Sequence, residues 1–360
     1  MLETRAPAFV LALPLALSLY ACAGSTPPLA SPSPAQAPAS AGSMASTALQ
    51  APPPAAEPSP EEKKKADQAR ELQEDRAQWQ KDKEAETARW TPQLHAGAKA
   101  LVDKCPTGGK EAILFVMKGD HRKPGAADRD KYRHPAETLD FFGFKTTMTV
   151  LDIGPGEGWY TELLAPALFK KGQYLATSAD PNGPPEERGT FYGQRFKAFL
   201  DTAPEIYGKA QTVVVDSKAP KLGKDGSLDM ALIMRGVHGM VNGGTFGAWL
   251  GEINRALKPG GVLGIEEHRA PAGSDPTQTA KKGYVPEAWV ISQAEAAGFK
   301  LAGKSEINAN PKDTKDYPEG VWTLPPTFRL GAADHDKYAA IGESDRMTLK
   351  FVKAAAKPAK

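Results

Sequence analysis

Residues 150–160 read VLDIGPGEGWY: an apolar run, an aspartate, and then glycine at positions 154, 156 and 158. Such an order is typical of a strand that ends in a tight turn before a helix. Glycine has no Cβ, so it adopts positive φ easily and lets a ligand come close to the backbone. The stretch therefore predicts a strand–loop–helix unit whose loop binds a ligand.

The chain after residue 144 alternates between strand-like and helix-like patterns. Residues 228–234 are almost entirely apolar, as expected for a strand buried on both faces of a parallel sheet. Apolar residues recur at helical spacing over 246–257, and the Lys-Pro-Gly-Gly turn at 258–261 ends that helix. This alternation predicts an α/β, Rossmann-like fold with a mostly parallel seven-stranded sheet and helices on both faces. The expected strands are 149–153, 174–179, 211–215, 228–234, 262–265, 300–307 and 347–352.

The first residues are typical of an export signal. Residues 6–21 carry no charge, which suits a signal-peptide core but is too short for a membrane span. The stretch Leu19-Tyr20-Ala21-Cys22, where this segment ends, resembles the bacterial lipobox. That resemblance implies that Cys22 is lipidated and becomes the mature N-terminus. An ordinary secretory signal is the alternative.

The predicted domain organisation has four parts. Residues 1–21 form the signal peptide, and the Ala/Pro/Ser-rich residues 22–60 form a disordered tether. Residues 61–144 form a charged helix and a helical extension, without the sustained heptads of a coiled coil. Residues 145–355 form the α/β domain, and residues 308–342 are long enough to be a lid-like insertion.

The composition excludes a strongly basic nucleic-acid-binding protein. Lys and Arg number 45 against 43 Asp and Glu, which gives a net charge of +2. The chain has two cysteines, so lipidation of Cys22 would leave Cys105 without a disulfide partner. No Cys-His pattern surrounds Cys105, which predicts a buried structural thiol.

Two cofactor classes compete for the glycine loop. A dinucleotide fingerprint has the spacing G-x-G-x-x-G, whereas this loop has G-x-G-x-G with Asp152 two residues before the first glycine. This arrangement resembles motif I of the class I S-adenosylmethionine-dependent methyltransferases. The resemblance implies that Gly154, Gly156 and Gly158 face the methionine and ribose part of S-adenosylmethionine. Asp152 would hold the loop or the amino group of the cofactor. A purely structural turn is the alternative.

Later blocks extend the resemblance. Asp180 follows the second strand, 22 residues after Gly158, close to the ~20 expected for a ribose-binding acid. Asp216 follows an apolar run where the family commonly contacts adenine. Either aspartate could instead cap a turn. The blocks at 132–139, 158–162, 267–270 and 310–326 look like a bacterial group of predicted, often exported, class I methyltransferases without a settled acceptor.

Two histidines fall at the carboxyl ends of adjacent expected strands. His238 follows Arg235-Gly236-Val237, and His268 follows two glutamates. Either could act as a catalytic base or hold an acceptor hydroxyl. A hydrogen-bonded loop histidine is the alternative. With Glu266 or Glu267 they could also gather a divalent cation, but no spacing requires one, so we predict no metal site.

Five further residues are predicted to contact the acceptor: Arg133, His134, Tyr160, Arg269 and Trp322. Tyr160 could stack near a sulfonium, and Arg133 and His134 could line the pocket from its N-terminal side. Arg269, like Arg235, could bind an anionic acceptor. Trp322 would give the insertion an apolar surface. Packing, helix capping or salt pairing is the alternative for each.

These features predict an exported enzyme that is anchored to the membrane by lipid and faces the periplasm. It would transfer a methyl group from S-adenosylmethionine to a small or envelope-derived acceptor. A soluble periplasmic form is the alternative location. A non-catalytic binding or scaffold protein with the same fold is the first rival function, and a nicotinamide oxidoreductase is the second. Nucleic acid is not an expected partner.

Overall fold

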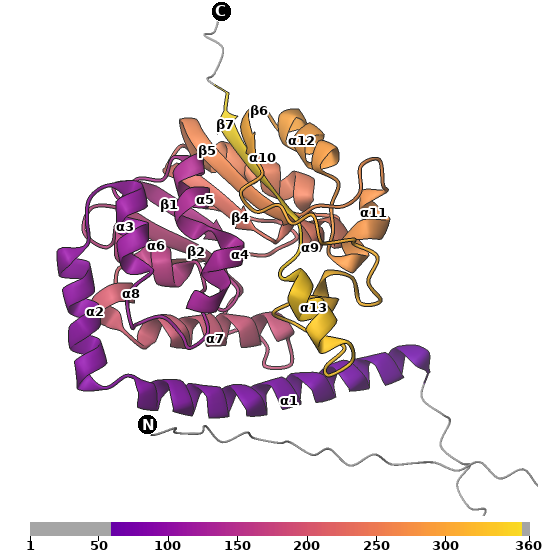
Figure 1. Cartoon of the computed structure of the whole chain (residues 1–360), viewed down its shortest axis with the longest axis horizontal. Helices are drawn as coiled ribbons and strands as arrows, with labels where there is room; N and C mark the ends of the chain where they lie inside the picture. The colour runs from indigo at the N-terminus through magenta and orange to yellow at the C-terminus, as the bar shows by residue number, and fades with distance from the viewer. Residues whose placement is uncertain (1–58, 355–360) are drawn as a thin grey trace, which may run out of the picture. The chain divides into compact units, whose positions relative to one another are not determined.

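The computed structural model describes residues 59–354. Within them, seven strands form one sheet in the order β3-β2-β1-β4-β5-β7-β6 (Figure 1). The pairs are parallel except those of β7, which runs antiparallel to β5 and to β6. This confirms the predicted fold class. The strands are β1 (Thr149–Ile153), β2 (Gln173–Ser178), β3 (Gln211–Val214), β4 (Leu228–Met234), β5 (Leu257–His268), β6 (Phe299–Ser305) and β7 (Arg346–Lys353).

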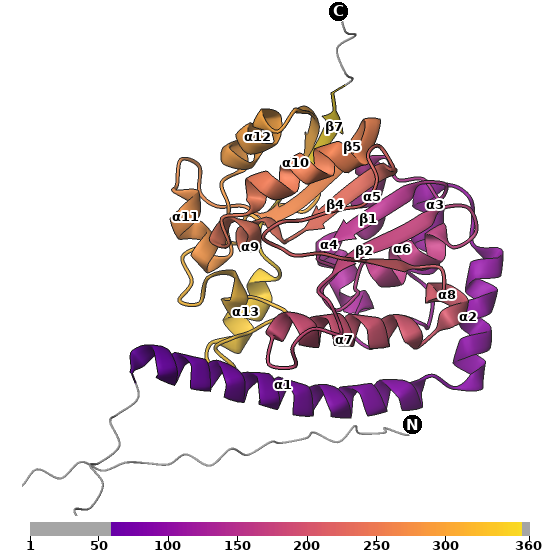
Figure 2. The same ribbon diagram turned by 180° about the vertical axis from the view of Figure 1, so that it is seen from behind.

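Helices cover both faces of the sheet because successive residues of the central strands point to opposite sides. Val150 and Leu232 belong to one buried apolar cluster, together with residues of α3, α5, α6 and α7. Leu151 and Ile233 belong to a second cluster, with residues of α9, α10 and α12. Figures 1 and 2 show the two layers from opposite sides. These helices are α3 (Gly109–Val116), α5 (Pro135–Phe142), α6 (Thr161–Leu168), α7 (Arg188–Asp201), α9 (Val237–Asn242), α10 (Phe246–Ala256) and α12 (Glu287–Ala296).

A long charged helix, α1 (Pro60–Arg89), precedes the α/β part and has one buried residue, Leu72. Trp79 packs edge-on against Phe191 of α7, with the ring centroids 5.7 Å apart. Figures 1 and 2 both show α1 running beside α7. The helix therefore docks through a narrow stripe, and most of its surface faces solvent. The helix α2 (Pro92–Lys104) follows α1, and the short connecting helices are η1 (Ala127–Arg129), α4 (Asp130–Arg133), α8 (Pro204–Tyr207), α11 (Pro276–Thr279) and η2 (Ala280–Lys282).

The fifth strand is longer than the sequence pattern predicts. We expect a strand at 262–265 after a turn at 258–261, but β5 already begins at Leu257. Leu257 pairs with Leu228, and the register shifts between Leu228 and Met230 before regular pairing resumes at Val262. The predicted start was wrong because the Pro-Gly-Gly residues form an irregularity within the strand rather than a turn before it.

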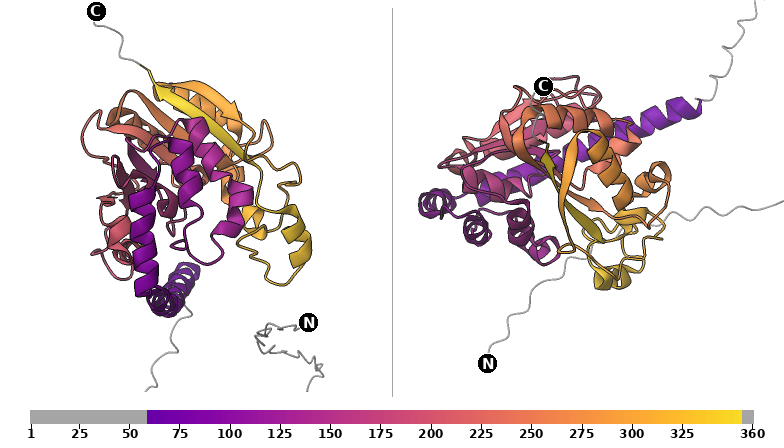
Figure 3. Two further views of the ribbon diagram at one scale, coloured as in Figure 1. Left: turned by 60° about the vertical axis from the view of Figure 1, so that its left-hand side comes forward. Right: turned by 90° about the horizontal axis from the view of Figure 1, so that it is seen from above.

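The predicted insertion at 308–342 has its own small core. It contains η3 (Gly320–Thr323) and α13 (His335–Ile341), and Tyr317, Leu324 and Tyr338 pack together within it. Its first residue, Asn308, is buried and donates hydrogen bonds to Thr138 of α5 at 2.9 Å and Thr348 of β7 at 3.0 Å. Figure 3 shows this yellow segment extending from the end of the sheet. The insertion is therefore an ordered unit with a fixed base.

Cys105 follows α2 and is buried, as predicted. Burial raises the pKa of its thiol, and Lys170 opposes this shift. A buried thiol with a raised pKa is unreactive at neutral pH.

The predicted signal peptide, Cys22 and nearly all of the tether lie outside the described residues. Among the helices of 59–354, none combines the length and the apolar character that crossing a membrane requires.

Candidate functional site

The glycine loop between β1 and α6 has the backbone that its sequence predicts. Gly154, Gly156 and Gly158 have φ values of 68°, 59° and 89°. A Cβ added at Gly154 or Gly156 would meet no heavy atom within 4 Å, and both residues are exposed. A Cβ at Gly158 would lie 2.6 Å from the Phe199 ring. Packing therefore requires Gly158, whereas Gly154 and Gly156 border open space that a ligand could fill.

The loop is held by side chains that the sequence pattern did not single out. The Gly154 amide donates to Oγ1 of Thr177, near the end of β2, at 2.9 Å. Lys123 Nζ donates to the Glu157 carbonyl at 2.8 Å, and Arg195 of α7 pairs with the Glu157 carboxylate. Thr177 could have been suspected only from its place near the carboxyl end of the second strand.

Asp152 lies in β1 and is buried beneath the loop. Its Oδ2 accepts a hydrogen bond from the Tyr174 hydroxyl at 2.9 Å, and that hydroxyl lies 2.7 Å from Oγ1 of Thr161 in α6. Burial raises the pKa of Asp152 to about 7, while the Tyr174 hydrogen bond opposes the rise. Asp152 is thus coupled to the start of α6 and changes charge near neutral pH.

Asp180 and Asp216 are exposed and follow the ends of β2 and β3. Asp180 accepts a hydrogen bond from the Asn182 amide at 2.9 Å, and Asp216 accepts one from the Lys218 amide at 2.9 Å. Both carboxylates therefore form the turn caps that were the alternative to ligand binding, although their exposure leaves room for further contacts.

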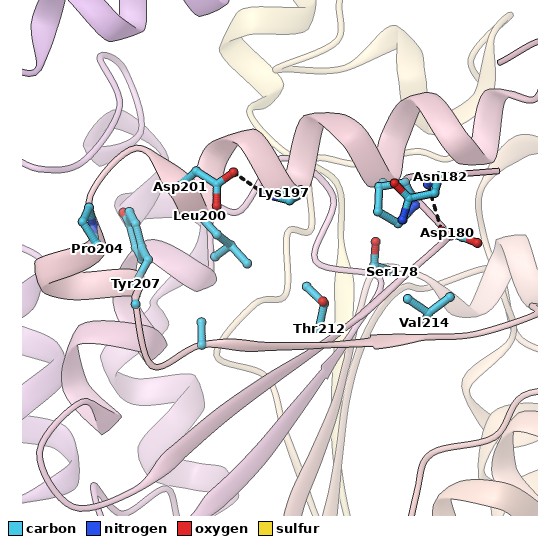
Figure 4. A pocket seen from close by; sticks show the side chains of 14 residues that line it. Ser178, Asp180, Asn182, Lys197, Leu200, Asp201, Pro204, Tyr207, Thr212 and Val214 are labelled. Carbon is cyan, nitrogen blue, oxygen red and sulfur yellow. Dashed lines mark hydrogen bonds and ion pairs between the residues drawn. The ribbon is translucent and has the colours of Figure 1, made fainter. Parts of the chain in front are cut away.

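A cavity of about 540 Å³ lies between α7 and strands β2 and β3 (Figure 4). Of the predicted cofactor residues, only Asp180 lines it; Ser178, Leu200, Thr212 and Val214 contribute other parts of the wall. The glycine loop is not part of its lining. Because the cavity runs along the edge strand, we place the candidate site at the glycine loop rather than in this cavity.

The two predicted catalytic histidines come together at the carboxyl edge of β4 and β5, with ring centroids 5.7 Å apart. His238 Nδ1 lies 3.0 Å from Oε1 of Glu267, which is fully buried. Burial lowers the pKa of His238, but the charge and hydrogen bond of Glu267 outweigh this and raise it overall. Burial, with His238 and Arg346 nearby, holds the pKa of His268 well below its usual value. His238 is therefore the better proton acceptor of the two.

The same three residues could also gather a divalent cation, as the sequence allows without requiring it. Ligand atoms of His238, Glu267 and His268 all lie within 4.8 Å of one another. However, Glu267 already accepts hydrogen bonds from the amides of Val237 at 2.5 Å, His238 at 3.3 Å and His268 at 2.9 Å. A carboxylate so fully used for hydrogen bonding fits a histidine–glutamate pair better than a metal ligand.

Three predicted acceptor residues lie in the layer of α4 to α6. The Tyr160 hydroxyl donates to Oε2 of Glu266 at 3.0 Å and is buried. Arg133 is 1% exposed and its guanidinium lies over the Trp159 ring at 4.5 Å. His134, with φ of 40°, has Nδ1 3.3 Å from Oδ1 of Asn308. Tyr160 and Arg133 therefore have internal partners, and His134 contacts the base of the insertion.

The other two predicted acceptor residues differ in their surroundings. Arg269 is paired with Glu306 at 2.7 Å and lies near Glu287 at 3.5 Å. These contacts match salt pairing, which was the alternative to acceptor binding for this residue. Trp322 of η3 stands edge-on to His238, with ring centroids 5.8 Å apart. The insertion thus places an aromatic wall beside the histidine–glutamate pair, whereas Arg269 is committed to neighbouring carboxylates.

Residues 127–298 match a family model described as a methyltransferase domain. The match includes the glycine loop and both histidines, and it supports S-adenosylmethionine as the cofactor. No curated protein matches the chain.

Several solved structures share part of the fold. A SAM dependent methyltransferase from Aquifex aeolicus is 18% identical, with 67% of this chain and 97% of that one covered at a TM-score of 0.41. The cyclase SpnF is 17% identical over 62% of this chain and 81% of its own, at 0.44. The glycopeptide N-methyltransferase MtfA, solved with S-adenosyl-L-homocysteine, is 14% identical over 61% and 86%, at 0.39. Their names describe different reactions, so the similarity assigns no acceptor.

The glycines of the loop should differ in what they contribute to stability. Gly158→Ala combines a positive φ with a clash against Phe199 and should cost about 2–4 kcal/mol of unfolding free energy. Gly154→Ala meets only the backbone penalty and should cost about 1–2 kcal/mol. Urea unfolding measures both losses, and equal losses would contradict the packing role of Gly158.

Asp152 should make stability depend on pH. Its folded pKa of about 7 lies above the unfolded value near ~3.9, so its ionisation costs the folded state stability as pH rises between those values. The stability of Asp152→Asn relative to the wild type should therefore rise by about 2–3 kcal/mol between pH 5 and pH 8. Denaturant unfolding at both pH values measures the gap, and a gap that does not widen would show that the carboxyl ionises normally.

Proposed function

We propose that residues 127–354 form an S-adenosylmethionine-dependent methyltransferase acting on a small or envelope-derived acceptor. The observation that carries the proposal is the pairing of two features at one edge of the sheet. One is a glycine loop with open space beside Gly154 and Gly156, and the other is a buried glutamate that orients His238. The match to a methyltransferase domain supports the same function.

The open space beside the glycines of the loop is consistent with a bound cofactor. Side chains at Gly154 and Gly156 would fill the space beside the backbone, which the native residues leave open. The family resemblance implies that Asp152, which directly precedes this loop, holds the loop or the cofactor's amino group. In this structure its buried carboxylate accepts a hydrogen bond from Tyr174 and so supports the loop from below. Asp180, which follows the end of β2, would contact the ribose of the cofactor. Bound S-adenosylmethionine would supply an electrophilic methyl group.

The residues at β4 and β5 would prepare the acceptor. With Nδ1 directed at Glu267, the Nε2 of His238 is left to accept the acceptor's proton. The lone pair left on the acceptor atom would then bond to the methyl carbon, and the bond from that carbon to the cofactor's sulfur would break to leave S-adenosylhomocysteine. Glu267 stabilises the resulting imidazolium and keeps the ring oriented, as the carboxylate does in a catalytic triad. Trp322 would limit the access of water from the insertion side.

The rival functions have less support. Among residues 59–354, no feature specifically favours a non-catalytic scaffold, and an open glycine loop serves no purpose in one. The G-x-G-x-G spacing disfavours a nicotinamide oxidoreductase, whose fingerprint has another residue between its second and third glycines.

Cofactor binding tests the proposal directly. The full-length protein should bind S-adenosylmethionine in isothermal titration calorimetry, and Gly156→Ala should weaken binding at least tenfold by filling space and straining the loop. Gly260→Ala is a matched control, since Gly260 has φ of 75° and no heavy atom within 4 Å of an added Cβ, but lies near the start of β5. Absence of binding by folded wild-type protein would overturn the proposal, as would equal effects of the two variants.

We also propose that the protein is exported and anchored to the membrane through lipid on Cys22, as its lipobox-like sequence suggests. Two anchoring signals are usually needed for stable attachment, and the multiple acyl chains of a bacterial lipoprotein would meet this requirement. Cys22→Ser should therefore move the protein from the membrane fraction to the soluble fraction of expressing cells. An unchanged distribution would rule out the anchor.

A further inference from the structure

Four arginines converge on two buried carboxylates at the carboxyl edge of the sheet. Glu343 is approached by four guanidinium nitrogens: Nε of Arg129 at 2.7 Å, Nε of Arg133 at 3.2 Å, Nη1 of Arg346 at 2.6 Å and Nη1 of Arg235 at 3.8 Å. Arg346 also faces Glu266, with Nε and Oε1 3.1 Å apart. These six residues form an arginine cluster, in which four guanidinium groups face two carboxyl groups, an excess of two positive charges.

The excess is costly because much of the cluster is buried. The side chains of Arg133 and Arg346 are 1% exposed, and Nη1 of Arg133 has no hydrogen-bond partner within the described part of the chain. A buried cation without a matching anion is strongly unfavourable. Glu343 and Glu266 cannot neutralise four guanidinium groups. A further anion would therefore complete the cluster.

Of the four arginines, Arg235 has the positive charge that the carboxylates compensate least. Its guanidinium forms no hydrogen bond within residues 59–354, and its closest opposite charge is Glu343 at 3.8 Å. Its Nε is buried and unpaired, while 21% of the side chain remains exposed. Its φ of 60° lies in the left-handed region, which disfavours any side chain. Such strain is typical of functional positions.

The position of Arg235 joins the two halves of the candidate site. Ile153 of β1 pairs with Ile233 of β4, so the glycine loop leaves the sheet beside the residues that lead to Arg235. The Arg235 amide donates to the Glu266 carbonyl of β5 at 2.6 Å, which fixes its backbone. His238 follows three residues later, at the start of α9. Arg235 thus lies between the proposed cofactor loop and the proposed base.

We propose that the arginine cluster binds the anionic group, a carboxylate or phosphate, of the methyl acceptor, with Arg235 as its principal contact. This inference rests on the proposed function, because it identifies the chemical class of the acceptor at the same site. Guanidinium groups bind these planar or tetrahedral anions through paired N–H donors, and Arg235 has its donors free of other acceptors. Arg129, 25% exposed, provides a second cation that solvent can reach.

One other anion has the same chemistry, since S-adenosylmethionine itself carries a carboxylate. The two sources predict different effects of Arg235 on cofactor binding. If the cluster serves the acceptor, removing the Arg235 guanidinium leaves the affinity for S-adenosylmethionine nearly unchanged. If it serves the cofactor, that affinity falls.

Inorganic phosphate is the first probe. In the full-length protein, 20 mM phosphate should raise the Tm by about 2–4 °C over sodium chloride of equal ionic strength. Arg235→Gln should lose this increment. Arg70→Gln is the matched control, because it removes the same charge from a 67% exposed side chain of α1 and should keep the increment. An increment that is equal in all three proteins would reflect general salt stabilisation and would overturn the proposal.

Arg235→Gly separates a binding role from a structural one. Glycine tolerates the positive φ and removes an uncompensated cation, so the Tm without phosphate should rise by about 2–4 °C while the phosphate increment disappears. If Arg235 had only a structural role, its removal should lower the Tm and leave the phosphate increment intact. A lower Tm combined with an intact phosphate increment would therefore refute the proposal.

Cofactor titration completes the test. Arg235→Gln should bind S-adenosylmethionine within about threefold of the wild type. A loss of tenfold or more, with decarboxylated S-adenosylmethionine bound equally by both proteins, would assign the cluster to the cofactor and overturn the proposal. If the wild type binds no S-adenosylmethionine but shows the Arg235-dependent phosphate increment, the proposed function fails while anion binding by the cluster stands.

Discussion

The ion pairs of the Glu343 carboxylate are the contacts on which the proposed acceptor side of the site depends. This carboxylate is 4% exposed and links Arg129 and Arg133, which precede the first strand, to Arg346 at the start of β7. Arg129 and Glu343 are 214 residues apart in the sequence. Loss of one partner in a buried ion pair typically costs about 3–5 kcal/mol, because the remaining charge is left uncompensated. The helices that precede β1 and the start of β7 therefore depend on one another for stability.

The two sides of the candidate site are stabilised by different kinds of interaction. The glycine loop is held mainly through its backbone: the amide of Gly154 and the carbonyl of Glu157 both bind side chains. The acceptor side is held through ion pairs and through the fully buried Glu267. Because Trp322 approaches His238 from the insertion, the acceptor side also depends on how that insertion is anchored. A change in the insertion should therefore affect the acceptor side more than the cofactor side.

The sequence predicted the features that depend on local pattern. Apolar runs located the strands, and the spacing of Gly154, Gly156 and Gly158 predicted positive φ, which all three have. The predicted start of β5 was wrong. A Pro-Gly-Gly segment can form either a turn or an irregular part of a strand, and here pairing with β4 decides between the two. His238 and His268 were brought together as expected, since parallel strands end at one edge.

Features that depend on distant partners could not be predicted. The sequence identified Arg133 and Tyr160 as polar or aromatic candidates, but not that Glu343 and Glu266 would bind them. Whether Asp180 and Asp216 cap turns or face a ligand is likewise undecided by local pattern, because the Asx turn and the ligand contact favour the same residue type. Thr177 gave no signal at all, since its role follows from the approach of the Gly154 amide.

The burial of Cys105 makes the protein suitable for site-specific labelling through an introduced cysteine. It is the one cysteine among residues 59–354, and its thiol is inaccessible as well as weakly acidic. In a Cys22→Ser background, a cysteine introduced at an exposed position of the insertion, such as Ala332, would be the sole thiol open to reagents. A spin label or fluorophore there would report the surroundings of the insertion without background from the rest of the described chain.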